Sequence, residues 1–142
     1  MFILLLMRQI NNDHSKIRYF KDFWTREIVE TNPNWLFIYG DNNIKKGLGG
    51  QAIIRGLPNT LGVPTKKYPS NAINSFYTDF EYIDNIKRIR KAINKIIKNE
   101  YKYEYIIFPE NGLGTGLADL PTKAPKTYAY LTKAIEKIKK IL

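Results

Sequence analysis

The stretch Tyr105–Pro121, YIIFPENGLGTGLADLP, places three glycines directly after an apolar run of strand length. These are Gly112, Gly114 and Gly116, and Asp119 follows them. Glycine weakens both helices and strands, so this many in succession indicates a loop whose backbone must stay free of side chains. A phosphate lying against the loop would require such a bare backbone, because main-chain N–H groups can then surround it. The stretch therefore predicts a buried strand followed by a phosphate-binding loop.

A second glycine-rich loop follows another apolar run. NWLFIYG, residues 34–40, reads as a buried strand, the polar segment DNNIKKGLGG follows it, and QAIIRG reads as a short helix. GLGGQA formally matches the dinucleotide-binding fingerprint, but the strand ends too far upstream. In addition, Lys66 and Lys67 stand where that motif needs an acidic residue. Without that motif, the segment still offers a glycine-rich backbone that can surround an anion at the start of a helix.

The other segments complete an alternating pattern. FWTREIVETNP predicts a short helix from about Thr25 to Pro33, and NTLGVPTKKYPS reads as a loop with at most a short strand. Two amphipathic helices are predicted, one from Glu81 and one from near Pro125 to the C-terminus. The apolar stripe of the first consists of Ile83, Ile86, Ile89, Ile93, Ile96 and Ile97, and that of the second of Tyr128, Leu131, Ile135, Ile138 and Ile141. Alternation of this kind favours an α/β domain with a largely parallel sheet, in which both glycine loops meet at one edge.

Composition narrows the possible chemistry. A chain of 142 residues with 44% hydrophobic and 25% charged residues is typical of one globular domain, here residues 1–142, with 1–15 peripheral. There is no cysteine and His14 is the one histidine, so we expect no metal site and no cofactor. The net charge of +10 favours an anionic partner. The alternative is that the lysines serve only to keep the outer faces of the helices solvated.

The apolar N-terminal run MFILLLM, residues 1–7, is too short to span a membrane and lacks the features of a signal peptide. It reads as an edge strand, or as an upstream start with Met7 the more natural beginning. We therefore expect a cytoplasmic protein with no membrane partner.

Together, YGDNNIKKGLGGQA and IIFPENGLGTGL resemble the two ligand-gripping loops of the macrodomain, an ADP-ribose-binding α/β/α module. The similarity spans roughly Trp35 to Leu131. PTKKYPS followed by a helix and then FPENGLGTGLAD is most similar to the branch that contains the terminal ADP-ribose glycohydrolase and the antitoxins that remove ADP-ribose from DNA. The resemblance implies a three-layer domain with a mixed, largely parallel central sheet, binding an ADP-ribose-like nucleotide. ADP-ribosylated protein or nucleic acid is the wider partner class that it implies.

The resemblance also implies residue roles. Lys66 matches the lysine that attacks or orients the ribose, and Asp119 matches the acid/base aspartate, although it stands one residue later than in the family pattern. Such a shift turns a side chain by a large angle. Both residues also have simpler interpretations, Lys66 as a phosphate contact and Asp119 as a helix N-cap. The expected ligand-binding residues are Asp41, Asn43, Gly47, Gly49, Gly50, Gln51, Thr65, Asn111, Gly112, Gly114, Thr115, Gly116 and Leu117.

The sequence is compatible with three functions. The first is ADP-ribose binding, with or without hydrolysis of ADP-ribosyl linkages. The second is a non-catalytic module that sequesters or senses a nucleotide. The third is nucleic-acid binding through the basic helices, although the sequence contains no recognised nucleic-acid motif. Tyr68, Phe76 and Tyr77 are candidates for stacking on a base in any of these.

Overall fold

A computed structural model describes residues 7–9 and 15–142 of the chain. In these residues the strands form one sheet with the order β1-β2-β5-β3-β4. The strands are β1 (Met7–Gln9), β2 (Ile17–Phe20), β3 (Trp35–Asn42), β4 (Thr60–Lys66) and β5 (Tyr105–Pro109). β1 runs antiparallel to β2, and the other four strands are mutually parallel. The predicted α/β class with a mixed, largely parallel sheet is therefore confirmed.

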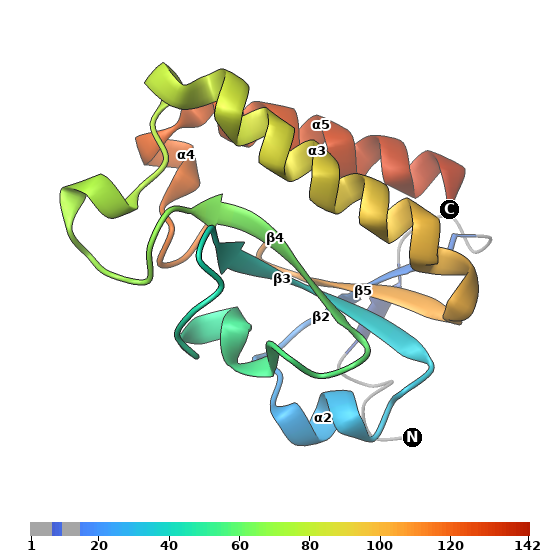
Figure 1. Cartoon of the computed structure of the whole chain (residues 1–142). Coiled ribbons are helices and arrows are strands. Elements are labelled where there is room, and N and C mark those ends of the chain that lie inside the picture. Colours follow the sequence, from blue (N-terminus) through green and yellow to red (C-terminus); the bar gives the residue numbers. More distant parts are fainter. Residues whose placement is uncertain (1–6, 10–14) are drawn as a thin grey trace.

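Helices cover both faces of this sheet (Figure 1). On one face α3 (Tyr82–Asn99) and α5 (Pro125–Ile141) pack side by side, and the short α4 (Leu120–Lys123) directly precedes α5. On the other face lie α2 (Arg26–Glu30) and the 3-10 helix η1 (Gly50–Ile54). The remaining 3-10 turns are η2 (Ile73–Ser75), η3 (Asp79–Glu81) and η4 (Glu100–Lys102). The arrangement has three layers, with the thicker helical layer formed by the C-terminal half of the chain.

The N-terminal predictions fall mostly outside the described residues. Of the apolar run only Met7 belongs to a described strand, the edge strand β1, whereas residues 1–6 and His14 are not described. No helix in the part of the chain that the structure describes is both long and apolar enough to cross a membrane.

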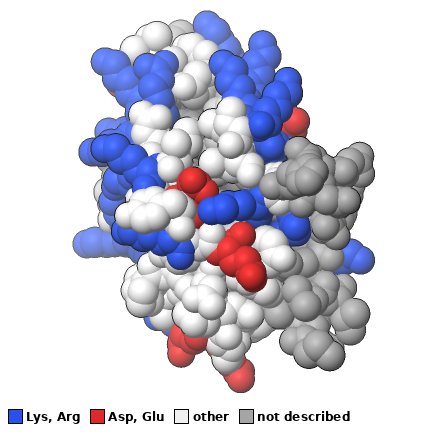
Figure 2. Space-filling view, turned by 90° about the vertical axis from the view of Figure 1, so that its right-hand side faces the viewer, with Lys and Arg blue, Asp and Glu red and all other residues white. Residues whose placement is uncertain are grey.

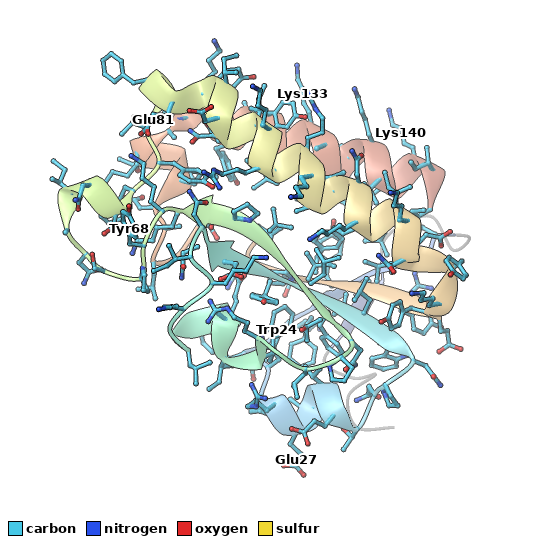
Figure 3. The ribbon with its side chains drawn as sticks, viewed as in Figure 1. Trp24, Glu27, Tyr68, Glu81, Lys133 and Lys140 are labelled. Carbon is cyan, nitrogen blue, oxygen red and sulfur yellow. The ribbon has the colours of Figure 1, made fainter. Side chains whose placement is uncertain are left out.

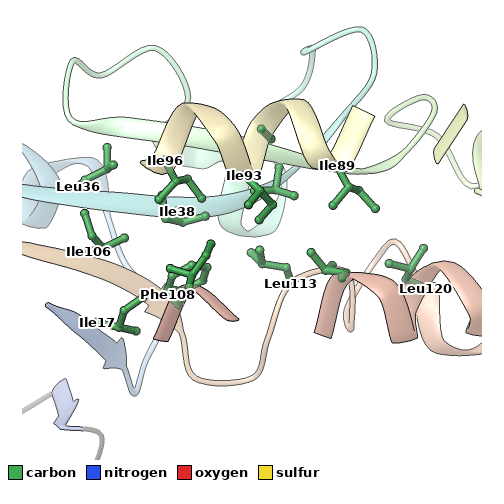
Figure 4. Close-up of a cluster of buried hydrophobic side chains, with 14 of the residues drawn as sticks. Ile17, Leu36, Ile38, Ile89, Ile93, Ile96, Ile106, Phe108, Leu113 and Leu120 are labelled. Carbon is green, nitrogen blue, oxygen red and sulfur yellow. The ribbon is translucent and has the colours of Figure 1, made fainter. Parts of the chain in front are cut away.

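Two hydrophobic cores form, one on each face of the sheet. Under α3 and α5, side chains such as Ile38 and Ile106 of the sheet pack against Ile89, Ile93 and Ile96 of α3 (Figure 4). Each fully buried side chain of this size contributes roughly 1.5–3 kcal/mol relative to an exposed one. The opposite core is mainly aromatic and consists of Phe20, Trp24, Val29, Trp35, Phe37, Tyr39, Ala52, Ile54 and Ile107.

The helix predicted from Glu81 is present as α3, but its apolar stripe is narrower than predicted. Ile89, Ile93 and Ile96 are buried, whereas Ile83 is 60% exposed and Ile97 is 39% exposed. Ile97 follows Ile96 by one residue, about 100° around the helix, and so lies off the buried stripe. Ile83 lies in the first turn of α3, which extends beyond the sheet (Figure 1). In α5, Ile141 of the last turn is likewise exposed.

The segment after Asn59, predicted as a loop with at most a short strand, forms the seven-residue strand β4. Pro64 misled the prediction because proline cannot donate a hydrogen bond to a strand ladder. β4 pairs only with β3, so it is an edge strand of the sheet, where a missing N–H is tolerated.

The N-terminus of α5 is capped by a carboxylate from a distant part of the chain. Its N-cap residue, Ala124, has no side chain that can accept a hydrogen bond. Asp79 accepts instead from the backbone N–H groups of Lys126 (2.9 Å) and Thr127 (3.0 Å), and from the Thr127 hydroxyl (2.9 Å). Buried Asn85 donates from Nδ2 to the same hydroxyl at 3.1 Å. Through this network the loop before α3 is tied to the start of α5.

Burial alone would raise the pKa of Asp79, but the hydrogen bonds from Lys126 and Thr127 lower it below its ordinary value of 3.8. A group with a depressed pKa in the folded state stabilises the protein above its unfolded-state pKa and loses that effect as pH falls. We therefore expect Asp79→Ala to lower the free energy of unfolding by about 1–2 kcal/mol at neutral pH. The deficit should begin to shrink below about pH 4, where the aspartate of the unfolded chain takes up a proton, and should disappear as pH falls through the lower pKa of folded Asp79.

Urea unfolding across pH checks this expectation. Glu30→Ala serves as the control because Glu30 is an exposed helical carboxylate. An Asp79→Ala deficit that is the same at neutral and acidic pH would contradict the capping role.

Candidate functional site

A cavity of about 540 Å³ lies at the carboxyl ends of the central strands. Both glycine-rich loops contribute to its walls, so the two segments that the sequence singled out meet in space. We call it the glycine cavity. Its lining consists of Phe23, Gly40, Gly49, Gly50, Gln51, Thr65, Asn111, Gly114, Thr115, Gly116, Leu117 and Ala118.

The topology of the sheet explains why a cavity forms here. β3 and β5 are parallel neighbours. From β3 the chain continues to η1 on one face of the sheet, whereas from β5 it continues to α4 and α5 on the opposite face (Figure 1). Where two neighbouring strands send their chains to opposite faces, the loops separate and leave a crevice, which is the common ligand site of open α/β sheets.

Gly40, at the end of β3, forms a point of close approach between the strands. A methyl group at this position would lie 3.3 Å from Gln51 Oε1, 3.5 Å from Thr65 Oγ1 and 3.7 Å from the backbone nitrogen of Gly114. A larger side chain would therefore fill the space between the two loops. In the sequence, Gly40 reads only as the end of a strand, because nothing in its local pattern indicates that another backbone lies so close.

Gln51 holds the two loops together. Its Oε1 accepts from the Gly40 N–H at 2.8 Å, and its Nε2 donates to the Gly112 carbonyl at 3.1 Å. Its own carbonyl accepts from the indole N–H of Trp24 at 3.1 Å, on the aromatic side of the sheet (Figure 3). Because both ends of its amide are engaged, Gln51 positions the walls of the cavity and leaves ligand contact to other groups.

The loop after β5 offers unpaired backbone donors. In the described part of the chain, the N–H groups of Thr115, Gly116 and Leu117 donate to no protein acceptor. The Thr115 hydroxyl, by contrast, donates to the Asn111 carbonyl at 2.7 Å and is already used within the loop. The cavity lining contains no charged side chain. An anion in this cavity would thus be held by main-chain dipoles, as in other backbone anion sites.

Gly114 and Gly116 contribute to this loop in different ways. Gly114 has φ +76, and a methyl group there would lie 3.1 Å from the Leu120 side chain and 3.2 Å from Thr65 Cβ. Gly116 has an ordinary φ, and a methyl group on it would meet nothing within 4 Å. Gly114 is therefore required by the fold, whereas Gly116 leaves free space in the cavity wall.

The structure places Asp41 away from the glycine cavity. Its carboxylate forms an ion pair with Arg55 and accepts from its own neighbour, the Asn42 N–H, at 2.8 Å. The Tyr39 hydroxyl lies 3.5 Å from Asp41 Oδ2, and burial together with the negative charge of Asp41 raises the pKa of Tyr39 to about 12. Arg55 also donates to the carbonyl of Gly47. Asp41 thus anchors the loop after β3 through Arg55.

Asn43 is also placed elsewhere. Its Oδ1 accepts from the Tyr77 hydroxyl at 2.6 Å, which ties the end of β3 to the segment before α3. Both Asn43 and Asp41 line a separate hollow between the end of β3 and α3. Neither of the remaining predicted glycines, Gly47 and Gly112, lines the glycine cavity, although each has positive φ and shapes its loop.

Lys66 does not line the glycine cavity. Its side chain is buried at the end of β4, with Nζ 4.7 Å from the centre of the Phe76 ring. Burial lowers the pKa of Lys66. The ammonium group of Lys123 lies 5.0 Å from the same ring. The structure therefore places Lys66 in a cation–aromatic cluster beside α4.

Asp119 is the N-cap residue of α4 and has the left-handed backbone angles φ 45 and ψ 40. Its side chain makes no capping hydrogen bond, and it does not line the glycine cavity, although its neighbour Ala118 does. The two residues expected to be catalytic, Lys66 and Asp119, are thus not among those that the structure brings together around the cavity.

Phe23 is a cavity residue that the sequence analysis missed. Its ring is 85% exposed and lines both the glycine cavity and a smaller adjoining hollow. The residues predicted to stack on a base are placed elsewhere: Tyr77 is buried and Tyr68 lies on the loop between β4 and α3 (Figure 3). In the sequence, Phe23 precedes a short helix and belongs to no motif. Only the folded chain therefore reveals its place at the mouth of the cavity.

Comparison with known proteins shows that the chain belongs to a protein family of unknown function, DUF7831, whose model matches residues 19–134. The matched range includes both glycine loops and all of β3, β4, β5 and α3. Neither curated proteins nor solved structures gave a match. In the described residues there is no cluster of three or more side chains of the types that bind metal ions.

The contrast between the two glycines gives a direct test of the loop geometry. Gly114→Ala should lower the free energy of unfolding by about 1–3 kcal/mol, because alanine is strained at positive φ and its methyl group crowds Leu120. Gly116→Ala should change it by no more than about 0.5 kcal/mol. Urea unfolding of both variants measures the difference, and equal stabilities would contradict the described loop.

Proposed function

We propose that this protein is a macrodomain-like module that binds the diphosphate of an ADP-ribose-type nucleotide in the glycine cavity. The observation that carries the proposal is the convergence of the two glycine loops on one cavity at the switch point of the sheet. The volume of about 540 Å³ lies within the roughly 300–1,000 Å³ typical of small-molecule sites.

The electrostatics of the cavity suit a diphosphate. Residues 115–117, whose N–H groups have no protein acceptor in the described part of the chain, line one wall, and the first residues of η1 line the other. The first N–H groups of a helix have no partner within the helix and carry partial positive charge. An extended anion with oxygens on both sides would satisfy both walls at once.

The exposed ring of Phe23 at the mouth of the cavity supports a nucleotide in preference to free phosphate. An aromatic face is a stacking surface for a base or a sugar. With the diphosphate between the two loops, a nucleoside would extend toward Phe23 and the adjoining hollow.

Binding without turnover is the version of this function that the geometry favours. Lys66 is engaged with Phe76, and Asp119 is not part of the lining, so neither candidate catalytic group faces the cavity. Catalysis would require an acid or a nucleophile at the reacting carbon. The protein would therefore sequester or sense the nucleotide.

Calorimetric titration with ADP-ribose, and with AMP and NAD for comparison, tests the proposal. We expect ADP-ribose to bind more tightly than AMP. Gly49→Val and Gly116→Val should each weaken ADP-ribose binding at least about tenfold, because each adds a side chain to a different wall; tenfold corresponds to 1.4 kcal/mol. A methyl group is tolerated at both positions, since the Gly49 position meets only Leu117 at 3.7 Å.

Ala72→Val is the matched control, because Ala72 is exposed on the loop before η2, outside the cavity. No binding of ADP-ribose, AMP or NAD would overturn the proposal. Release of ADP-ribose from an ADP-ribosylated substrate, abolished by Asp119→Ala, would overturn the non-catalytic version alone.

A further inference from the structure

We infer that the outward face of α3 is a second binding surface, which takes the phosphate backbone of a nucleic acid. Two adjoining hollows lie along this helix. The first, of about 250 Å³, lies between α3 and the ends of β3 and β4, and the second, of about 400 Å³, follows the exposed side of α3. They share Lys91 and Lys95. We call the combined surface the α3 groove; its cations are Lys45, Lys87, Arg88, Arg90, Lys91, Lys95 and Lys98.

The charge of the α3 groove is strongly one-sided, because the one carboxylate in its lining, Asp41, is already paired with Arg55. The eighteen residues of α3 include six lysines and arginines and one carboxylate, Asp84. Among the described residues, no cation of the groove forms an ion pair with a carboxylate. The same bias appears in Figure 2, in which lysines and arginines gather over the upper part of the face, where the helical layer lies.

This row of cations destabilises the helix that carries it, so its presence in α3 needs a physical explanation. Lys87, Lys91 and Lys95 are spaced four residues apart, so each is a neighbour of the next on the helix surface. Like charges at this spacing destabilise a helix. A helix that merely needed solvation could alternate acidic and basic residues, as stabilised exposed helices do. An anionic partner along the groove would turn the repulsion into favourable contacts.

The loop after β3 supplies the second wall of the groove. Lys45 is exposed there and holds the left-handed angle φ 56, which residues other than glycine seldom adopt. The turn is fixed by Asn42, whose Nδ2 donates to the Lys46 carbonyl at 2.7 Å. A strained lysine held on a fixed turn opposite Lys91 and Lys95 makes a groove with cations on two sides.

The spacing of the charges favours a nucleic acid as the occupant. Four residues of α-helix rise about 6 Å, so the lysines present cations at regular intervals of that size along the groove. A nucleic acid strand carries regularly repeated phosphates, and phosphate contacts of this kind read no sequence. The occupant is therefore a nucleic acid bound through its backbone.

This inference does not depend on the proposed nucleotide site. The α3 groove and the glycine cavity have no lining residue in common. One site holds its anion with backbone dipoles and the other with lysine and arginine side chains. Substitutions in one should therefore leave binding at the other unchanged.

The test is fluorescence anisotropy of a short labelled DNA duplex titrated with the full chain at several KCl concentrations. We expect the double variant Lys91→Gln/Lys95→Gln to bind at least about tenfold more weakly. The slope of log affinity against log salt should fall by about 2, since two phosphate contacts are lost.

Lys133→Gln/Lys140→Gln is the matched control. Both lysines are exposed on α5 and point away from the sheet (Figure 3), and the variant removes the same charge. It should retain most of the affinity, and the α3 variant should bind ADP-ribose as the unmodified protein does. Three outcomes would overturn the inference: no DNA binding, equal losses in the two variants, or equally tight binding of a poly-glutamate peptide.

Discussion

The pairing of β5 with both β2 and β3 is the constraint on which the rest of the structure depends. Parallel strands cannot be joined by a tight hairpin, so each connection must cross a face of the sheet. β5 is inserted between the earlier strands β2 and β3. Its own connections, α3 before it and α4 with α5 after it, lie on one face of the sheet, whereas α2 and η1, which flank β3, lie on the other. The two helical layers, the two cores and the crevice at the strand ends all follow from this insertion.

Close backbone contact then defines the shape of the glycine cavity. The Gly114 nitrogen, Thr65 and Gln51 all lie near Gly40, where a single methyl group would already be crowded. The Gln51 amide fixes this arrangement by bonding one loop on each side. The cavity is therefore preformed, and under the proposed function its main-chain N–H donors would not have to reorganise to hold an anion. Preorganised donors give tighter binding because less freedom is lost on association.

Several polar groups near the strand ends are satisfied within the fold, whereas the cations of α3 are exposed to solvent. Asp41 neutralises Arg55, Asp79 caps α5, and Asn43 accepts from Tyr77, so each of these buried or half-buried groups is satisfied within the fold. Satisfied groups of this kind avoid the large cost of an unpaired polar atom in the interior. Of the α3 cations, Arg90 donates from Nε to the Tyr130 hydroxyl at 3.2 Å, and none forms an ion pair with a carboxylate in the part of the chain that the structure describes. The molecule thus has a cavity with no charged side chain in its lining and a separate, highly charged groove.

The sequence by itself determined the class of fold, the strands β3 and β5, the helices α2, α3 and α5, and the two glycine loops, because apolar periodicity and runs of glycine are local properties. It underestimated β4, where Pro64 obscured the length of an edge strand, and it was wrong at Ile83 and Ile97, whose burial depends on what lies under the helix. Only the tertiary structure decided that Gly40 and Phe23 belong to the cavity, that Gln51 is a clamp, and that Lys66 and Asp119 are not part of its lining. The reason is that a side chain's direction and neighbours are set by strands distant in sequence, which no local pattern encodes.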